Sequence, residues 1–371
     1  MDEKYMKRAI ELAKLGAGHT NPNPLVGCVV IKDGKIISEG YHEKYGEFHA
    51  ERNALLRCTE NTEGAELYVT LEPCCHQGKT PPCTDIIIEK GIKRVYVGSS
   101  DPNPLVDGGG NKKLRDNGIE VIEHVMEREC DALNEIFFHY ISKKTPFVAM
   151  KYAMTLDGKI AAFTGDSKWV TGEEARKHVH YLRKRYAGIM AGIGTVLADD
   201  PMLNCRIEDG LNPVRIICDS ALRIPENSNI VKTACDIKTI VACSDRADES
   251  AEKNLTEKGV HVVRVPSLPN GRLDLKWLMQ YLGQDMKIDS ILLEGGGTLN
   301  ASALEQNIVN KIYAYIAPKL IGGADAKSPI EGRGIEYMKD AVNAEDVHVQ
   351  MLGNDICIEG RIKEVDECLP E

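Results

Sequence analysis

The first part of this protein is best characterised by one stretch of sequence, Pro73-Cys74-Cys75-His76-Gln77-Gly78-Lys79-Thr80-Pro81-Pro82-Cys83. It is preceded along the chain by His49-Ala50-Glu51. The imidazole of His49 and the thiolates of Cys74 and Cys83 form a three-ligand set. Such a set leaves the fourth tetrahedral position of a zinc ion open, which distinguishes catalytic from structural zinc sites. Glu51 lies at the start of a predicted helix, beside the ligand His49, where its carboxylate can transfer protons without binding the metal.

The combined pattern, His-x-Glu followed by Pro-Cys and a second Cys, is the signature of zinc nucleobase deaminases. The main alternative is a structural zinc site, which would need a fourth ligand such as Cys75 or His76. Cys75 also competes with Cys74 for the role of ligand, and we choose Cys74 because it directly follows Pro73. The ligand types favour zinc, although iron or cobalt can occupy such a site.

Length and composition bound the other possibilities. The chain has 371 residues, of which 43% are hydrophobic, and a formal net charge of -10. This length predicts two or three globular domains, and the composition excludes disordered and fibrous classes. No apolar stretch approaches the roughly 18 residues of a membrane-spanning helix, and the first ten residues lack the apolar core of a signal peptide. We therefore expect a cytoplasmic protein with no membrane partner, and the acidic balance argues against nucleic-acid binding.

The chain contains 12 cysteines, which is unusual for a protein of this length. Since no export signal is expected, a disulfide framework is not predicted and most of the thiols should be reduced. Nine of them stand alone in apolar or helical contexts, where a small buried side chain is the simplest interpretation. Only Cys74, Cys75 and Cys83 crowd together.

Helical and strand patterns alternate along most of the chain, which predicts the α/β class. The first part begins with a helix over 2 to 16 and a hairpin over 25 to 41 that turns at Asp33-Gly34. It ends with a helix over 126 to 141. A polar break with a proline at 142 to 146 then separates two domains, 1–144 and 145–371. In the second part the alternation resumes and the last predicted strand is 311 to 317.

The first domain resembles the deaminase domain of the bifunctional deaminase/reductase family of riboflavin biosynthesis. The resemblance rests on 20 to 27 (Thr-Asn-Pro-Asn-Pro-Leu-Val-Gly), on His49-Ala50-Glu51 and on 70 to 83, whose long spacing between the two cysteine ligands is typical of that family. It implies that the pocket for a pyrimidine ribotide is lined by Asn23, His42, His76, Asp101 and Asn103. Asn103 can equally be a turn residue in Asp-Pro-Asn-Pro.

The second domain gives weaker signals of its own. The run from Glu294 to Thr298, with three glycines, ends a buried strand and opens a helix, so its N–H groups could receive a phosphate, although a plain loop fits as well. The domain also resembles the reductase half of the same family, through 151 to 161, 165 to 169, 192 to 201 and 294 to 297. The resemblance implies NADPH contacts from Ala153, Trp169, Thr195, Asp199, Ser220, Gly296 and Gly297. It implies substrate contacts from Lys151, Ser167, Arg183, Leu203, Arg206 and Glu294.

The resemblance covers nearly the whole chain. It implies a cytidine-deaminase-like three-layer α/β/α domain followed by a dihydrofolate-reductase-like α/β domain. The expected function is zinc-dependent deamination of a diaminopyrimidine ribotide, followed by NADPH-dependent reduction of its ribosyl group to ribityl. We also expect a homo-oligomer. Two alternatives are a deaminase acting on a base in RNA and a structural zinc module fused to a reductase.

Overall fold

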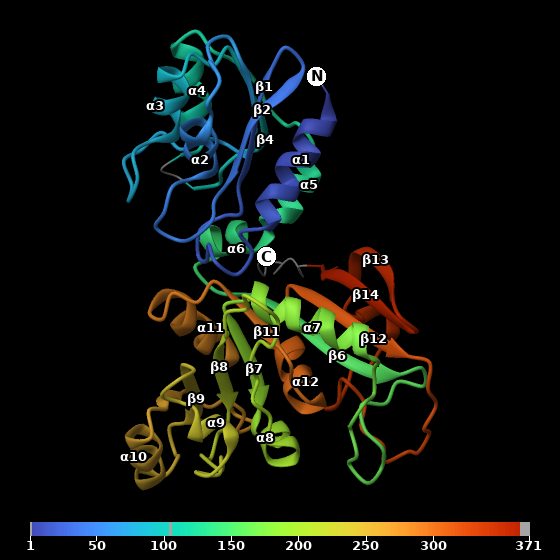
Figure 1. Ribbon diagram of the computed structural model, residues 1–371. Helices are drawn as coiled ribbons and strands as arrows, with labels where there is room; N and C mark the ends of the chain where they lie inside the picture. Colours follow the sequence, from blue (N-terminus) through green and yellow to red (C-terminus); the bar gives the residue numbers. More distant parts are fainter. Residues whose placement is uncertain (1, 104–105, 364–371) are drawn as a thin grey trace, which may run out of the picture. The chain divides into compact units, whose positions relative to one another are not determined.

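The computed structural model describes residues 2–103 and 106–363. The chain divides into two compact units, Met1–Lys144 and Thr145–Glu371 (Figure 1). Among the described residues no helix combines the length and the apolar character that crossing a membrane requires.

Unit 1 is built around one five-stranded sheet with the order β2-β1-β3-β4-β5. Strand β1 runs antiparallel to β2 and β3, whereas β3, β4 and β5 are parallel. The strands are β1 (Gly27–Lys32), β2 (Lys35–Tyr41), β3 (Glu66–Leu71), β4 (Arg94–Ser99) and β5 (Glu120–Ile122). The helices are α1 (Glu3–Lys14), α2 (Ala50–Arg57), α3 (Cys83–Glu89), α4 (Gly109–Asp116), α5 (Glu127–Leu133) and α6 (Glu135–Lys143).

Both faces of this sheet are buried, because alternate residues of each strand point to opposite sides. In β1, Cys28 and Val30 pack in the hydrophobic cluster that includes α2, α3 and α4. Val29 and Ile31 pack instead with residues of α1 and α5. The result is the predicted three-layer α/β/α arrangement (Figure 1).

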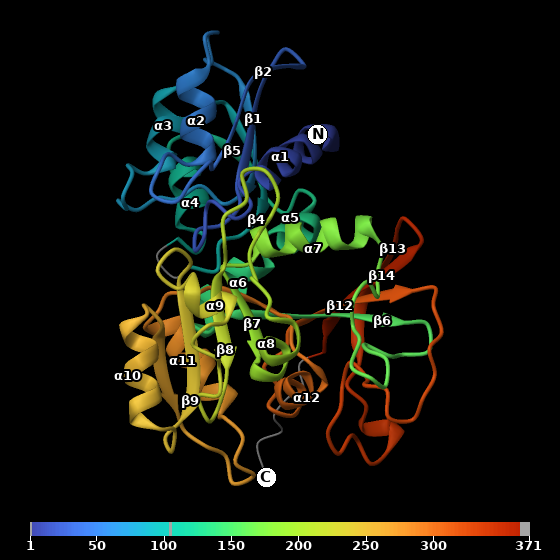
Figure 2. The same ribbon diagram turned by 60° about the horizontal axis from the view of Figure 1, so that its bottom comes forward.

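Unit 2 contains a nine-stranded sheet with the order β10-β9-β8-β7-β11-β6-β12-β14-β13. The seven strands from β10 to β12 pair in parallel, and an antiparallel hairpin, β13 and β14, completes one end (Figures 1 and 2). The strands are β6 (Phe147–Thr155), β7 (Gly188–Gly192), β8 (Val214–Cys218), β9 (Thr239–Ser244), β10 (His261–Val265), β11 (Ser290–Leu293), β12 (Lys311–Ala317), β13 (Ala344–Leu352) and β14 (Asp355–Ile362). The helices are α7 (Glu173–Arg185), α8 (Ile193–Asp199), α9 (Asn229–Lys232), α10 (Glu249–Glu257), α11 (Leu275–Gln284), α12 (Gly297–Glu305) and a short 3-10 helix, Met338–Asp340.

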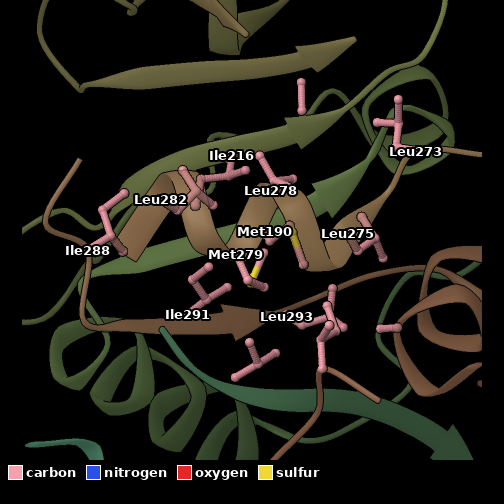
Figure 3. Packing of buried hydrophobic residues seen from close by; sticks show 14 of the residues in the cluster. Met190, Ile216, Leu273, Leu275, Leu278, Met279, Leu282, Ile288, Ile291 and Leu293 are labelled. Atoms are coloured by element: carbon pink, nitrogen blue, oxygen red, sulfur yellow. The ribbon is translucent and has the colours of Figure 1, made fainter. Parts of the chain in front are cut away.

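The core of unit 2 lies on both faces of the parallel strands. On one face α11 packs its apolar side against the sheet, with Leu278 and Leu282 over Met190, Ile216 and Ile291 (Figure 3). The intervening strand residues point to the opposite face and pack with α8, α9 and α10. Because Leu282 is fully buried, truncating it to alanine would cost about 2–5 kcal/mol. This packing holds the carboxyl ends of the parallel strands, where ligands bind in open α/β sheets, in fixed positions.

Several elements differ from the sequence prediction, among them the short helices α8 and α9, which were not predicted. The helix expected over 126 to 141 is two helices, α5 and α6. The break lies at Asn134, whose side chain forms hydrogen bonds with the backbone of Leu25. Asn134 Oδ1 accepts a hydrogen bond from the Leu25 N–H at 2.8 Å, and its Nδ2 donates to the Leu25 carbonyl at 3.0 Å. The hairpin of β13 and β14 was not predicted, although it turns at Gly353-Asn354, a dipeptide typical of tight turns.

Candidate active sites

In unit 1 three side chains that are distant in sequence meet at helix and strand ends. His49 is the N-cap residue of α2, Cys74 follows β3, and Cys83 is the first residue of α3. Their ligand atoms lie within 4.8 Å of one another, and they are the only group of this kind among the described residues. The Nδ1 atom of His49 lies 3.5 Å from Cys74 Sγ and 3.4 Å from Cys83 Sγ.

These separations suit a metal ion. Tetrahedral bonds of zinc to nitrogen and sulfur place the two ligand atoms about 3.6 Å apart. Cys75 does not belong to the group. Its Sγ lies instead near Gly109 of α4, where an added methyl group would be only 3.1 Å away. With no fourth ligand among the described residues, the donor set fits a zinc ion that keeps one position for water.

Glu51 lies beside this group and faces a cavity of about 250 Å³. Its side chain is buried, with an exposed fraction of 3%, and its Oε2 has no hydrogen-bond partner among the described residues. Burial, together with the charge of Cys74, raises the pKa of the Glu51 carboxyl to about 7. A buried carboxylate oxygen without a partner is costly in a folded protein, so it marks a functional position.

The same cavity is lined by all five residues expected to contact a ribotide: Asn23, His42, His76, Asp101 and Asn103. The Asn23 amide and the His42 ring are joined at 3.2 Å, and His42 Nδ1 lies 3.1 Å from the Phe48 carbonyl. Burial lowers the pKa of His42, so its ring is neutral. Burial raises the pKa of Asp101 to about 6, although the Asn103 N–H opposes this by donating to its carboxylate.

Two residues at this site were missed by the sequence reasoning. Lys79 is the only lysine or arginine among the described residues that line the cavity, and its Nζ lies 4.0 Å from the centre of the Tyr45 ring. Glu72 is buried and accepts hydrogen bonds from three backbone N–H groups at the start of α4. Lys79 lies between the cysteine ligands and could have been found there, whereas no sequence pattern indicated what Glu72 contacts.

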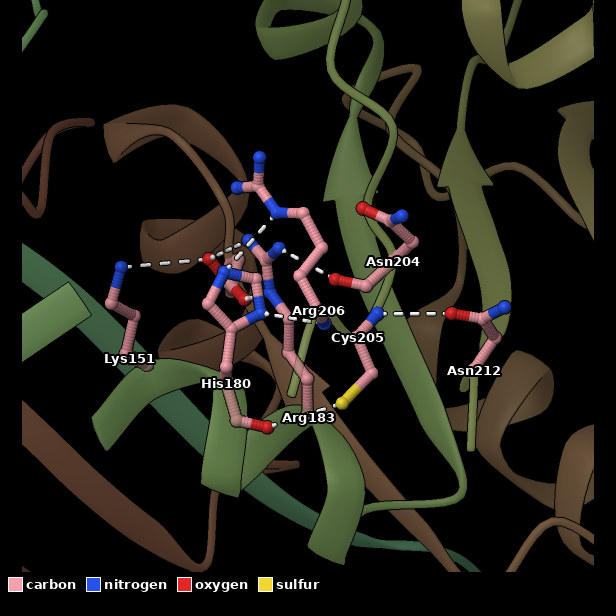
Figure 4. Close-up of polar contacts among 8 residues, drawn as sticks. Lys151, His180, Arg183, Asn204, Cys205, Arg206 and Asn212 are labelled. Carbon is pink, nitrogen blue, oxygen red and sulfur yellow. Dashed lines mark hydrogen bonds and ion pairs between the residues drawn. The ribbon is translucent and has the colours of Figure 1, made fainter. Parts of the chain in front are cut away.

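In unit 2 a partly buried charge cluster forms around Glu294, which directly follows β11; Figure 4 labels its two cations, Lys151 and Arg183. Arg183, from α7, binds both oxygens of Glu294, at 2.7 and 3.1 Å, and Lys151, from β6, lies 3.5 Å from Oε2. Burial opposes ionisation of Glu294, but the charges of Arg183 and Lys151 outweigh it and lower its pKa to about 2. The carboxylate is therefore ionised, and its two cations are held in fixed directions.

The second cavity lies in unit 2, at the carboxyl ends of the parallel strands, and has a volume of about 460 Å³. Five of the seven expected NADPH contacts line it: Thr195, Asp199, Ser220, Gly296 and Gly297. Ser167, expected to contact substrate, also lines it and donates to Asp199 Oδ1 at 3.3 Å. The cavity can take a phosphate at the first turn of α12, where the Gly296 and Gly297 backbone lies, so the surroundings fit a dinucleotide.

The remaining expected residues lie elsewhere. Ala153 is on β6, and Trp169 is exposed, with the Arg176 guanidinium 4.3 Å above its ring. Neither is among the residues that line the second cavity. Leu203 is buried with a positive φ of 45°. Arg206 is exposed and lies next to His180 (Figure 4). Sequence reasoning missed Arg272 and Lys327, two cations that line the cavity.

Comparison with known proteins assigns a class to each unit. Residues 1–99 match the family model of the cytidine and deoxycytidylate deaminase zinc-binding region, and residues 146–358 match that of the RibD C-terminal domain. The protein is thus an enzyme that joins a zinc-dependent deaminase to a reductase.

The whole chain has relatives of the same organisation. It is 55% identical over 358 residues to the riboflavin biosynthesis protein RibD of Actinobacillus pleuropneumoniae, covering 96% of this chain and 94% of the relative. The RibD of Escherichia coli is 38% identical, with 96% and 98% covered. A crystal structure from Thermotoga maritima, described as a diaminohydroxyphosphoribosylaminopyrimidine deaminase/5-amino-6-(5-phosphoribosylamino)uracil reductase, superposes with a TM-score of 0.86. That chain is 40% identical, with 97% and 98% of the two chains covered.

The chain belongs to the family of the riboflavin biosynthesis protein RibD. The predicted fold class and the bifunctional deaminase and reductase activity are confirmed. Zinc and NADPH are the cofactors, as expected. Family membership also argues against the RNA deaminase and the structural zinc module.

Proposed function

We propose that unit 1 hydrolyses the exocyclic amino group of diaminohydroxyphosphoribosylaminopyrimidine and that unit 2 reduces the product, 5-amino-6-(5-phosphoribosylamino)uracil, with NADPH. Both compounds are those of the Thermotoga maritima relative. The observation that carries the proposal is the three-ligand group of His49, Cys74 and Cys83 beside the buried oxygen of Glu51, in a cavity of ligand size.

In the deamination His49, Cys74 and Cys83 hold the metal and Glu51 moves the protons. Zinc in this donor set supplies a water of lowered pKa as the nucleophile. Glu51 would accept one proton from the attacking water and pass it to the ring nitrogen as the C–O bond forms. It would then take the remaining proton of the added hydroxyl and deliver it to the amine, so that the C–N bond breaks and ammonia leaves. The free Oε2 of Glu51 gives this proton transfer an open acceptor.

The other residues of the cavity bind and orient the ribotide. Asn23, joined to His42, presents an amide to the ring edge, and Asp101 and Asn103 belong to the same lining. Lys79 and His76 supply the positive charge and the donors that a ribose phosphate needs. His42 is neutral and serves as a hydrogen-bonding group.

In the reduction NADPH supplies a hydride to C1' of the opened ribosyl group, and a proton completes the ribityl chain. Thr195, Asp199, Ser220 and the Gly296-Gly297 backbone bind the dinucleotide in the second cavity. Lys151 can donate the proton, and the ionised carboxylate of Glu294, held by Arg183, can orient the ribose hydroxyls. On the family resemblance we also assign Ser167, Leu203 and Arg206 to the substrate, and Ala153 and Trp169 to the cofactor, although the last two do not line the second cavity.

The substitution Glu51→Gln tests the assignment of unit 1. We expect the variant to keep its zinc, measured by metal analysis, and to lose ammonia release from the diaminopyrimidine ribotide. Oxidation of NADPH with the deaminated ribotide should continue. Glu60→Gln, an exposed glutamate of the same unit, is the matched control and should deaminate normally. Normal ammonia release by Glu51→Gln would refute the proton-transfer role.

We further propose that the protein is a cytoplasmic homo-oligomer with no nucleic-acid or membrane partner. Strand β13 is the end strand of its sheet, and Val347, Val349 and Met351 on one of its faces are 51%, 64% and 62% exposed. An exposed apolar edge strand is a liability unless something covers it. We propose that a second copy of the chain covers this strand. Val349→Lys should lower the mass measured by light scattering, whereas Gln350→Lys, on the other face, should not; equal masses for all three proteins would contradict this interface.

A further inference from the structure

Helix α7 fixes a loop segment that carries Arg206. Arg183 donates to the Asn204 carbonyl at 3.0 Å, and the Cys205 thiol contacts the His180 carbonyl at 3.5 Å. The Arg206 N–H lies 3.2 Å from His180 Nδ1 (Figure 4). The segment from Asn204 to Arg206 is thus attached to one face of α7, since His180 and Arg183 are three residues apart on that helix.

The His180 ring also contacts the side chain of Arg206. Arg206 Nε lies 3.3 Å from His180 Nε2. A neutral imidazole has one acceptor nitrogen, so at any moment the ring accepts either from the Arg206 backbone or from its Nε. Burial, followed by the charges of Arg183 and Arg206, lowers the pKa of His180 to about 4, which keeps the ring neutral and able to accept.

The guanidinium of Arg206 remains available for a ligand. Within the described part of the chain its two terminal nitrogens have no acceptor, and the side chain is exposed (Figure 4). Lys151 and Arg183 both pair with the single carboxylate of Glu294, and His180 links Arg206 to the same helix as Arg183, so the cations here outnumber the carboxylate. An excess of positive charge at this point suits an anionic group such as a phosphate.

An exposed arginine normally samples many rotamers, and holding it still costs binding energy when a ligand arrives. A contact that fixes its Nε before binding reduces this cost and leaves the outer edge of the guanidinium free for a bidentate contact. His180 makes this contact without adding a charge of its own.

We propose that His180 is a positioning residue that directs the Arg206 guanidinium toward the phosphate of the reductase substrate. This inference rests on the proposed reductase function of unit 2. His180 does not touch the reacting atoms, so its effect should fall on substrate binding rather than on the chemical step.

The test measures KM for the deaminated ribotide, KM for NADPH and kcat in the full chain. His180→Ala should raise the first constant about tenfold, because a hydrogen bond to a charged group is lost, and should change the other two by less than about twofold. Lys177→Ala, an exposed position of the same helix, is the control. His180→Gln, whose amide oxygen replaces Nε2 as acceptor, should restore most of the affinity. His180→Asn, which keeps an acceptor only near Nδ1, should restore less.

A double-mutant cycle with Arg206→Ala separates positioning from general damage to the helix. If His180 acts through Arg206, adding His180→Ala to Arg206→Ala should raise KM by less than about twofold more. The inference would be overturned if the two substitutions multiplied their effects on KM, or if His180→Ala lowered kcat alone. If the wild type is active and His180→Ala leaves KM unchanged, this inference is overturned but the proposed function is not. If the wild type oxidises no NADPH with the deaminated ribotide, both the proposed function and this inference are overturned.

Discussion

Replacement of Glu72 by glutamine should loosen the metal site of unit 1 although Glu72 is not a ligand. Glu72 Oε1 accepts from the N–H groups of Gly110 and Asn111 at 2.9 and 3.1 Å, and Oε2 accepts from Gly108 at 3.0 Å. Its carboxylate therefore joins the end of β3, two residues before Cys74, to the start of α4.

The expected cost follows from these contacts. A glutamine can keep the two bonds at Oε1, but its NH2 group would face the Gly108 N–H, leaving a buried donor unpaired at about 1–3 kcal/mol. Losing a negative charge at a helix N-terminus adds about 0.3–2 kcal/mol. The variant Glu72→Gln should thus lose about 1–5 kcal/mol of the stability of unit 1.

Zinc release during a urea titration, followed with a chromogenic chelator, measures this loss locally. With a slope of about 2 kcal/mol per molar urea, the middle of the usual range, this loss should lower the midpoint of release by about 0.5–2.5 M. Glu89→Gln makes the same chemical change at an exposed position of unit 1 and should shift the midpoint little. An unchanged midpoint for Glu72→Gln would refute the reasoning that the α4 contact holds the ligand segment.

Three further outcomes are expected. Removal of zinc by a chelator should abolish ammonia release and leave NADPH oxidation with the deaminated ribotide intact; loss of both activities would contradict the division of labour between the units. Since the pKa of Glu294 is about 2 in the fold against 4.5 unfolded, its ionisation stabilises unit 2 in full above about pH 4.5 and less as the pH falls toward 2. The difference in melting temperature between wild type and Glu294→Gln should therefore be constant above about pH 5 and shrink below it, and a constant difference throughout would count against this. Gly110→Ala should reduce zinc affinity, measured by competition with a chelator, because its new methyl group would lie 2.0 Å from the Pro73 carbonyl; Gly109→Ala, which meets only the Cys75 thiol at 3.1 Å, should have a smaller effect, and equal affinities would argue against the close packing.

The strongest sequence patterns predicted much of the fold and the metal group. Helical patterns alternating with mostly buried strands predicted a sheet covered on both faces. Pro82, beside Cys83, marked the start of α3. These predictions depended on neighbours along the chain, and single-sequence patterns report such neighbours well.

Features that depend on distant residues could not be predicted in this way. The helix break at Asn134 arises from bonds to Leu25, more than one hundred positions away, which outweigh local helix propensity. Glu72 and His180 carry no recognisable pattern, because their roles lie in backbone N–H groups and in an arginine brought near by the fold. The β13–β14 hairpin did have a local signal, its Gly353-Asn354 turn.

The most direct test of the account is incubation of the purified protein with diaminohydroxyphosphoribosylaminopyrimidine, with and without NADPH, followed by mass spectrometry of the products. Without NADPH only the deaminated ribotide should accumulate, its amino group replaced by oxygen. With NADPH the product should carry two further hydrogens on the former ribosyl group. Unchanged substrate under both conditions, or reduction without any deamination, would contradict the central claim that one chain performs both steps.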